Sequence, residues 1–232
     1  MLWKRTVVHF ISESERSCTS SQAKHVTKAH QTRDRILSEA LRQGTIRGFS
    51  AVSLADVAEA VGLSKSAVFK HFGAKDALQM AVVERLVQDF TGAVWRPAAQ
   101  LSPGRQRLDL ILDRWLAWVD GESGDGGCGL IQAQIEFDDQ PGALRERLKA
   151  QQTRWNRVLV REFSALAGGL INLDQAQQAA FEFRGLVLGY NQSRRLLNDD
   201  ASRKLANRAY EALIDRVMAL APPVRTAPGK PN

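Results

Sequence analysis

A short basic stretch of the chain carries side chains that could bind a nucleic acid. Residues 52–76 read VSLADVAEAVGLSKSAVFKHFGAKD, and a helix formed by the second half would present Lys65, Ser66, Lys70 and His71 on its outer face. Ammonium groups and hydroxyls bind phosphate oxygens, and a lysine can also donate to the O6 and N7 atoms of guanine. This chemistry favours DNA recognition by a helix that enters the major groove.

Two short helices joined by a glycine would position these side chains. Ser53 stands three residues before an aspartate, which is capping-box spacing and predicts a helix that begins at this point. Gly62 ends this helix and Ser64 caps the next one. In the second helix Val68 and Phe72 share one face and would pack on the first helix, so the opposite face stays polar. The pattern predicts a helix-turn-helix.

The remaining polar residues do not form a set that would support catalysis or metal binding. All four histidines lie between residues 9 and 71, outside the region that could form a cavity, and the carboxylates near Asp138 have no His or Cys companion. The glycine-rich segment GESGDGGCG at 121–129 lacks the Lys-Ser/Thr ending of a phosphate-binding loop. We therefore expect no enzyme, no metal site and no cofactor.

Composition is consistent with a DNA-binding protein of the cytoplasm. The chain has 232 residues, 44% of them hydrophobic, and a formal charge of +7, which favours a polyanionic partner. Its two cysteines, Cys18 and Cys128, are too few for a disulfide scaffold. A redox role for Cys128 would need a favoured thiolate, against which the neighbouring Asp125 argues. No apolar run approaches the roughly 20 residues of a membrane span, so we expect neither export nor insertion.

Helical periodicity and breaker residues predict an all-α chain of about nine helices. We expect a flexible arm at 1–30, a helix-turn-helix domain at 31–78, a helical body at 79–220 and a disordered tail at 221–232. The long helices are expected at 32–48, 75–95, 105–119, 130–138, 142–167, 174–197 and 201–220. Gly44 should weaken the first of them near its end, and Pro97 should stop the second.

Over about Thr32 to Arg85 the chain resembles the TetR family of bacterial transcriptional regulators. The strings TRDRILSEAL, SLADVAEAV and GLSKSAVFKHFGAKDAL carry the resemblance, and GGCGLIQAQIEFDDQPGALRERL is similar to the sixth helix and following turn of one subgroup. The resemblance implies an N-terminal three-helix DNA-binding domain and a larger ligand-binding and dimerisation domain. It assigns DNA contacts to Ser53, Lys65, Ser66, Ala67, Phe69, Lys70, His71 and Lys75.

The resemblance also implies partners for the helical body. A homodimer would form through the last two helices, 173–198 and 201–220, whose apolar stripes are Ala176, Ala180, Phe183, Val187 and Tyr190 in one and Leu205, Ala209, Leu213 and Val217 in the other. A small-molecule effector would lie in a cavity whose candidate lining residues are Trp115, Trp118, Gln134, Phe137, Trp155 and Tyr190. Glu136 and Arg184 are further candidate polar anchors.

These residues favour a sequence-specific, dimeric regulator of transcription, most simply a repressor that a small-molecule effector releases from operator DNA. The alternative is a sequence-blind or architectural DNA-binding protein. Ala67 and Phe69 favour that alternative, because family members often have Thr and Tyr at these positions and their hydroxyls bind the DNA backbone. The identity of the effector, the operator and the sense of regulation are left open by the residues.

Overall fold

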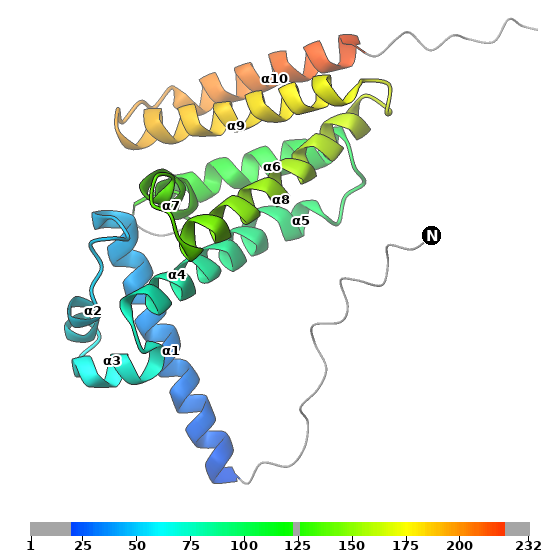
Figure 1. Cartoon of the computed structure of the whole chain (residues 1–232). Helices are drawn as coiled ribbons and strands as arrows, with labels where there is room; N and C mark the ends of the chain where they lie inside the picture. The colour runs from blue at the N-terminus through cyan, green and yellow to red at the C-terminus, as the bar shows by residue number, and fades with distance from the viewer. Residues whose placement is uncertain (1–19, 123–125, 221–232) are drawn as a thin grey trace, which may run out of the picture. The chain divides into compact units, whose positions relative to one another are not determined.

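The computed structural model describes residues 20–122 and 126–220, and within these ranges every regular element is helical (Figure 1). The elements are α1 Ser20–Arg47, α2 Leu54–Ala60, α3 Lys65–Phe72, α4 Lys75–Phe90, η1 Thr91–Trp95, α5 Arg96–Ala98, α6 Arg105–Ala117, η2 Trp118–Glu122, α7 Gly129–Phe137, α8 Ala143–Leu166, α9 Leu173–Arg195 and α10 Ser202–Leu220. If α4, η1 and α5 are taken as one helix and η2 as the end of α6, the described residues form nine helices. The all-α class is confirmed.

The first helix begins earlier than the sequence pattern predicted. The chain divides into two units, residues 1–35 and 36–232, and α1 crosses the boundary between them. Helix α1 starts at Ser20, so residues 20–30, expected in a flexible arm, are helical. The apolar stripe that marks the helix starts only at Ile36, but no Gly or Pro precedes Gly44 to stop a polar helix. The rest of the expected arm and the expected tail lie outside the described residues.

A small core holds the helix-turn-helix together. Val68 is fully buried and Phe72 is nearly so, as their spacing predicted, and Phe49 is also buried in the hydrophobic core. Gly44 is necessary for this packing, because a Cβ atom built on it would lie 2.4 Å from the Phe49 ring. The glycine that was expected only to weaken α1 therefore admits the aromatic ring that closes the core.

The long connecting helix does not stop before its proline. Helix α4 continues through the π-helical turn η1 into α5, and Pro97 lies within the first two residues of α5. The π-helical turn changes the backbone pairing just before the proline, where Arg96 N–H donates to the carbonyl oxygen of Thr91 five residues earlier, and such a turn lets the helix continue past a residue that has no N–H group. The predicted end at Trp95 is therefore corrected to Ala98.

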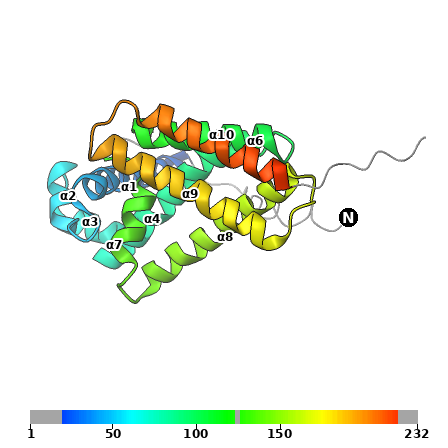
Figure 2. The ribbon, with the colours of Figure 1, turned by 90° about the horizontal axis from the view of Figure 1, so that it is seen from above.

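In the helical body α9 and α10 run antiparallel and side by side, and α9 also packs on α6 and α8 (Figure 2). The apolar stripes predicted to face a second copy are mostly buried inside the protomer instead. Phe183 and Val187 of α9 and Leu213 of α10 are at most 2% exposed. Other apolar residues, chiefly Phe181 and Leu188, are exposed on α9. No described helix is both long and apolar enough to cross a membrane.

Candidate DNA-binding surface and effector site

Two side-chain caps fix the start of each helix in the helix-turn-helix. Ser53 Oγ accepts a hydrogen bond from the backbone N–H of Asp56 at 3.1 Å, and Ser64 Oγ accepts one from Ala67 N–H at 3.1 Å. Gly62 between the helices has a φ of +69°, which a residue with a side chain rarely adopts. Both predicted caps and the predicted turn are confirmed. They orient α3 relative to α2 by local interactions.

The candidate DNA contacts gather on the outer face of α3. Lys65, Ser66, Phe69 and Lys70 are exposed and fall within an arc of about 140° at 100° per residue. Ala67 and His71 are half-buried and lie about 60° and 100° beyond Lys70 around the helix, and Ser53 is half-buried at the start of α2. Phe69 is 55% exposed, so it lies outside the small core and is available to contact DNA.

Lys75 has a role within the protein besides its predicted contact with phosphate. Its ammonium donates a hydrogen bond to the carbonyl oxygen of Ser50. Ala74, which precedes it, is the N-cap of α4 and makes no side-chain capping hydrogen bond, because an alanine side chain has no polar atom. Lys75 therefore joins the start of α4 to the turn before α2.

Residues 48–50 form a junction between the DNA-binding helices and the body. The Glu136 carboxylate of α7 accepts hydrogen bonds from Phe49 N–H at 2.7 Å and from Ser50 N–H at 2.6 Å. Gln79 of α4 donates to the Phe49 carbonyl oxygen at 3.0 Å. Gly48 has a φ of +93°, and a Cβ atom there would lie 3.4 Å from the carboxylate. Sequence reasoning listed Glu136 as an effector anchor; the structure places it at this junction, which we call the Glu136 junction.

The glycine-rich segment positions α7 against α1 and α4. A Cβ atom built on Gly126 would lie 2.2 Å from the Thr45 carbonyl oxygen, and one on Gly129 would lie 2.8 Å from Leu86 and 2.9 Å from Thr45. Only glycine permits such a close approach. These glycines therefore serve helix packing, which seats α7 where Glu136 can reach the turn.

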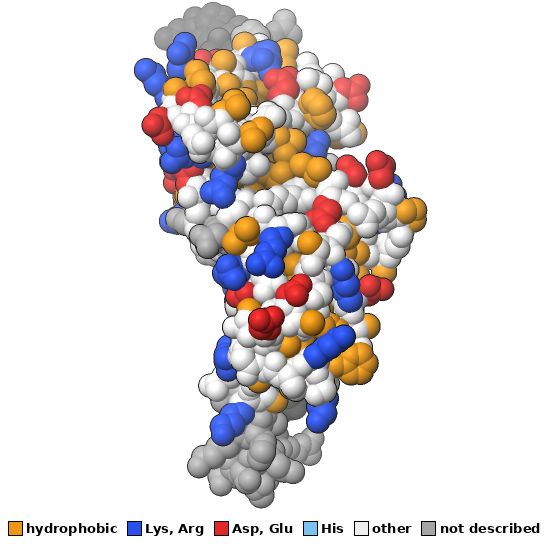
Figure 3. All heavy atoms as spheres, turned by 90° about the vertical axis from the view of Figure 1, so that its left-hand side faces the viewer, with side chains coloured by type: hydrophobic (Ala, Val, Ile, Leu, Met, Phe, Trp, Pro, Cys, Tyr) orange, Lys and Arg blue, Asp and Glu red, His pale blue; other side chains and the backbone are white. Residues whose placement is uncertain are grey.

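Charged side chains are interspersed on the face that includes the DNA-binding helices. Figure 3 shows Lys and Arg dispersed among Asp and Glu on this face, with no single basic patch. The exposed lysines of α3 therefore contribute local contacts rather than a positive electrostatic potential that extends over the whole face. This distribution suits recognition by specific contacts better than a purely electrostatic mode of binding.

The aromatic residues predicted to line the effector cavity fill it. Trp115 and Trp155 stack edge-on with ring centroids 5.6 Å apart, and Phe90 lies 5.3 Å from the first and 5.4 Å from the second. The cavity that remains beside them, also lined by Gln134, measures about 20 Å³. Organic ligands occupy cavities of roughly 300–1,000 Å³. These tryptophans are core residues in this conformation.

The other cavity candidates are dispersed. Gln134 and Phe137 line a separate hollow of about 210 Å³ between α7 and α8. Tyr190 lines neither cavity, and its hydroxyl donates a hydrogen bond to Asp120 Oδ1 at 2.6 Å. Trp118 is likewise buried and packs on the aromatic cluster, 6.0 Å from Phe90. The six predicted lining residues therefore do not meet around one cavity of ligand size.

Cys128 is buried beside this cluster. Burial raises the pKa of its thiol, although indole and backbone groups nearby act in the opposite direction. The thiolate is the reactive form of cysteine, so this environment disfavours oxidation by peroxide or disulfide exchange. The structure gives no support to redox sensing at this residue.

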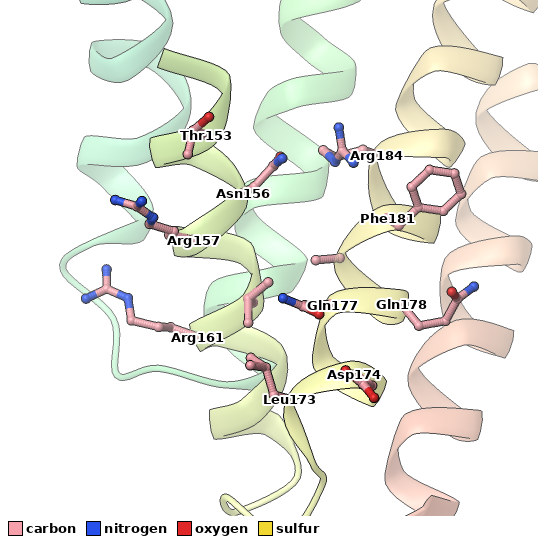
Figure 4. A pocket seen from close by; sticks show the side chains of 12 residues that line it. Thr153, Asn156, Arg157, Arg161, Leu173, Asp174, Gln177, Gln178, Phe181 and Arg184 are labelled. Carbon is pink, nitrogen blue, oxygen red and sulfur yellow. The ribbon is translucent and has the colours of Figure 1, made fainter. Parts of the chain in front are cut away.

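A larger groove of about 790 Å³ runs between α8 and α9 (Figure 4). Its lining mixes apolar side chains with arginines and amides; these residues are Thr153, Asn156, Arg157, Val160, Arg161, Leu173, Asp174, Gln177, Gln178, Ala180, Phe181 and Arg184. Of the residues that the sequence suggested as effector contacts, only Arg184 lines this groove. The groove has the volume of a ligand site. Periodicity did not signal it, because the space left between the consecutive helices α8 and α9 depends on how they pack and not on the pattern within either helix.

Comparison with known families agrees with this architecture. The profile described as "Bacterial regulatory proteins, tetR family" matches residues 36–82, and "Tetracyclin repressor-like, C-terminal domain" matches residues 104–210. The transcriptional activator FasR of Mycolicibacterium smegmatis is 27% identical over 33% of this chain and 35% of its own length. The transcriptional regulator TcmR of Streptomyces glaucescens is 27% identical over 62% of this chain and 65% of its own length. The chain thus spans less than two thirds of either relative.

Solved structures share the fold. A TetR-family regulator from Cytophaga hutchinsonii superposes with a TM-score of 0.69 at 21% identity, over 90% of this chain and 99% of the other. AibR, solved in complex with isovaleryl coenzyme A and operator DNA, superposes with a TM-score of 0.63 at 22% identity, over 82% and 98%. At such identities the likeness concerns the fold.

Proposed function

Because the chain belongs to the TetR family of bacterial transcriptional regulators, we propose that it binds operator DNA sequence-specifically as a homodimer and regulates transcription from the cytoplasm. The observation that carries the proposal is the division of α3 into two faces. Val68 and Phe72 are buried against the domain, whereas Ser66 and Lys70 are exposed together on the opposite face and Lys65 is exposed at the first residue of the helix. A helix held in this way can present its polar face to the major groove.

The proposed dimer uses the outer faces of α9 and α10. Leu188 of α9 is 47% exposed, and Leu205 of α10 is 51% exposed. Gly185 lies three residues before Leu188 along α9, and no atom stands within 4 Å of a Cβ built on it, so another helix can approach closely. A dimer places two reading helices on a twofold-symmetric site, with half-sites about 34–36 Å apart or at a multiple of that spacing.

We further propose that an effector acts on DNA affinity through α4 and α7. Arg147 of α8 donates two hydrogen bonds to Glu84 of α4, one of them at 2.8 Å, and α7 holds the Glu136 junction. A ligand that favours a different placement of these helices would change the orientation of α3. Repression relieved by an effector is the simplest form of this regulation. AibR, solved with both an effector and operator DNA, is a precedent for the two partners.

The competing function is sequence-blind DNA binding. It is favoured by Ala67 and Phe69, which lack the hydroxyls that family members often use on the DNA backbone. We assign no catalytic role, and no group of three or more His, Cys, Asp or Glu side chains in the described part of the chain could hold a metal ion.

Selection from random duplex DNA by the purified full chain, at near-physiological salt, tests the proposal. A dimeric regulator enriches a palindromic motif, and the position of that motif in the genome names the regulated genes. Enrichment of DNA without a shared motif would support the sequence-blind alternative.

A further inference from the structure

The groove between α8 and α9 contains a cationic group that the protein does not neutralise. Arg184 makes no ion pair within the described residues, and its Nε atom is buried there without a hydrogen-bond acceptor. Its guanidinium carbon lies 5.7 Å from the centre of the Phe181 ring. Burial lowers the pKa of Arg184, which reflects the cost of holding this charge away from water. An anion in the groove would offset that cost.

Asn156 supplies a second donor on the opposite wall. Figure 4 shows its amide on the side of α8 that faces Arg184. The amide oxygen of Asn156 accepts a hydrogen bond from Gln152 Nε2 at 2.8 Å, so the amide NH₂ group is directed to other partners. A guanidinium and an amide NH₂ on facing helices form a donor pair suited to one carboxylate or phosphate group.

The wider charge and shape of the groove favour the same kind of ligand. Arg157 and Arg161 line it as well, and Asp174 is the one acid among its lining residues, so three positive charges less one negative charge leave +2. Figure 4 shows the Arg157 and Arg161 head groups on the flank of α8 away from Arg184, where they add field rather than direct contacts. Val160, Leu173 and Phe181 supply apolar surface to the lining of the groove.

We propose that this groove binds an amphipathic organic anion, with its carboxylate or phosphate group between Arg184 and Asn156 and its apolar part along Phe181. The inference rests on the proposed function in one respect, because the anion would be the effector of the regulator. The groove between α8 and α9 replaces the aromatic cluster around Trp155 as the effector site in this conformation.

Two hydrogen bonds lead from the site to α7, the helix that carries Glu136. Asn156 is bonded to Gln152, and Gln152 Oε1 accepts from Gln134 Nε2 of α7 at 3.0 Å. Gln134 stands two residues before Glu136 on the same helix. An anion that reorients the Asn156 amide would therefore alter a contact that holds α7, and α7 holds the turn before α2.

Isothermal titration calorimetry of the full-length protein tests the site with three probes of similar size: octanoate, octyl phosphate and the uncharged octan-1-ol. We expect octanoate or octyl phosphate to bind, and the tighter of the two identifies the anionic group. Arg184→Gln should weaken binding of that anion by roughly 10- to 100-fold, because a charge-assisted hydrogen bond is lost. Octan-1-ol should bind weakly and equally to both proteins.

The matched control is Arg114→Gln, which removes one exposed arginine of α6 outside the groove and should leave anion binding unchanged. Failure of both anions to bind, or equal weakening by the two substitutions, would overturn the inference. If Arg184→Gln fails to fold, as judged by its thermal unfolding, Asn156→Leu should weaken the same anion severalfold, and unchanged affinity would again overturn it.

The same proteins separate this inference from the proposed function. A palindromic DNA motif without binding of either anion would leave the regulator intact and refute the site. Anion binding that depends on Arg184, without any selected DNA motif, would support the site and refute the operator-binding function.

Discussion

Removal of the Glu136 carboxylate should destabilise the protein far more than its half-buried position suggests. Two backbone N–H groups, those of Phe49 and Ser50, donate to it at 2.7 and 2.6 Å. A hydrogen bond to a charged group contributes about 1.5–3 kcal/mol net. The lower value applies to each bond, since the site is only part-buried and water can replace some of the interaction. Glu136→Ala should therefore cost about 3 kcal/mol of unfolding free energy.

Urea unfolding followed by circular dichroism measures this cost. Glu136→Gln retains one acceptor oxygen but loses the charge, so its cost should fall between that of Glu136→Ala and zero. Asp139→Ala removes an exposed carboxylate three residues away and should change the unfolding free energy by less than about 0.5 kcal/mol. An unfolding free energy for Glu136→Ala equal to that of Asp139→Ala would refute the assignment of the Glu136 junction as a structural link.

Three further substitutions test other parts of the account. Gly44→Ala should destabilise the protein by about 1–3 kcal/mol in urea unfolding, because overpacking against Phe49 outweighs the gain of about 1 kcal/mol in helix propensity. The hydrogen bond from Arg147 lowers the pKa of Glu84, so this pair contributes stability at neutral pH that is lost as the pH falls through the lowered pKa. Glu84→Gln should therefore be less stable than wild type at pH 7, and the difference should shrink toward pH 3. If the proposed dimer forms through α9 and α10, Leu188→Arg should convert it to monomer in sedimentation analysis.

Each of the three predictions has a control variant or a result that would contradict it. Gly92 has no atom within 4 Å of a built Cβ, so Gly92→Ala should not destabilise the protein as Gly44→Ala does. A Glu84→Gln difference that stays constant from pH 7 to pH 3 would contradict a role for the ionised carboxylate. Leu170→Arg changes a leucine that is 52% exposed in the turn before α9, and loss of the dimer in this variant as well would contradict the proposed interface.

The sequence was sufficient where the governing interactions are local. Ser53 and Ser64 cap helices through bonds to residues three positions ahead, and Val68 and Phe72 share a face by helical spacing. Such signals can be read in a window of a few residues. This explains why the helix-turn-helix and the all-α class were predicted correctly.

The sequence was insufficient where contacts join distant segments. Glu136 reaches a turn 86 and 87 residues earlier, and Gly126 is required by the Thr45 carbonyl oxygen. The type of residue, glutamate or glycine, does not indicate which distant segment it will contact. The start of α1 at Ser20 was missed for a different reason, because a polar helix without an apolar stripe has no periodicity to detect.

The effector site illustrates a third reason why the sequence alone was insufficient. Tryptophans such as Trp115 are equally suited to a closed core and to a ligand pocket, and only the packing of their neighbours decides between the two. Arg184 was recognised as a candidate anchor by its type. Its position in a groove, without an acidic partner among the described residues, required the structure.

The central claim is that the exposed face of α3 reads DNA, and the binding of a selected duplex by two lysine variants tests it most directly. Lys70→Ala removes a charge from the outer face of α3, whereas Lys149→Ala removes one from an exposed position on α8. Measured by fluorescence anisotropy, Lys70→Ala should lower the affinity for the selected duplex by about tenfold relative to random duplex, since one base contact discriminates by about 1–3 kcal/mol. Lys149→Ala should leave that ratio unchanged. Equal ratios for the two variants and the wild type would contradict the claim.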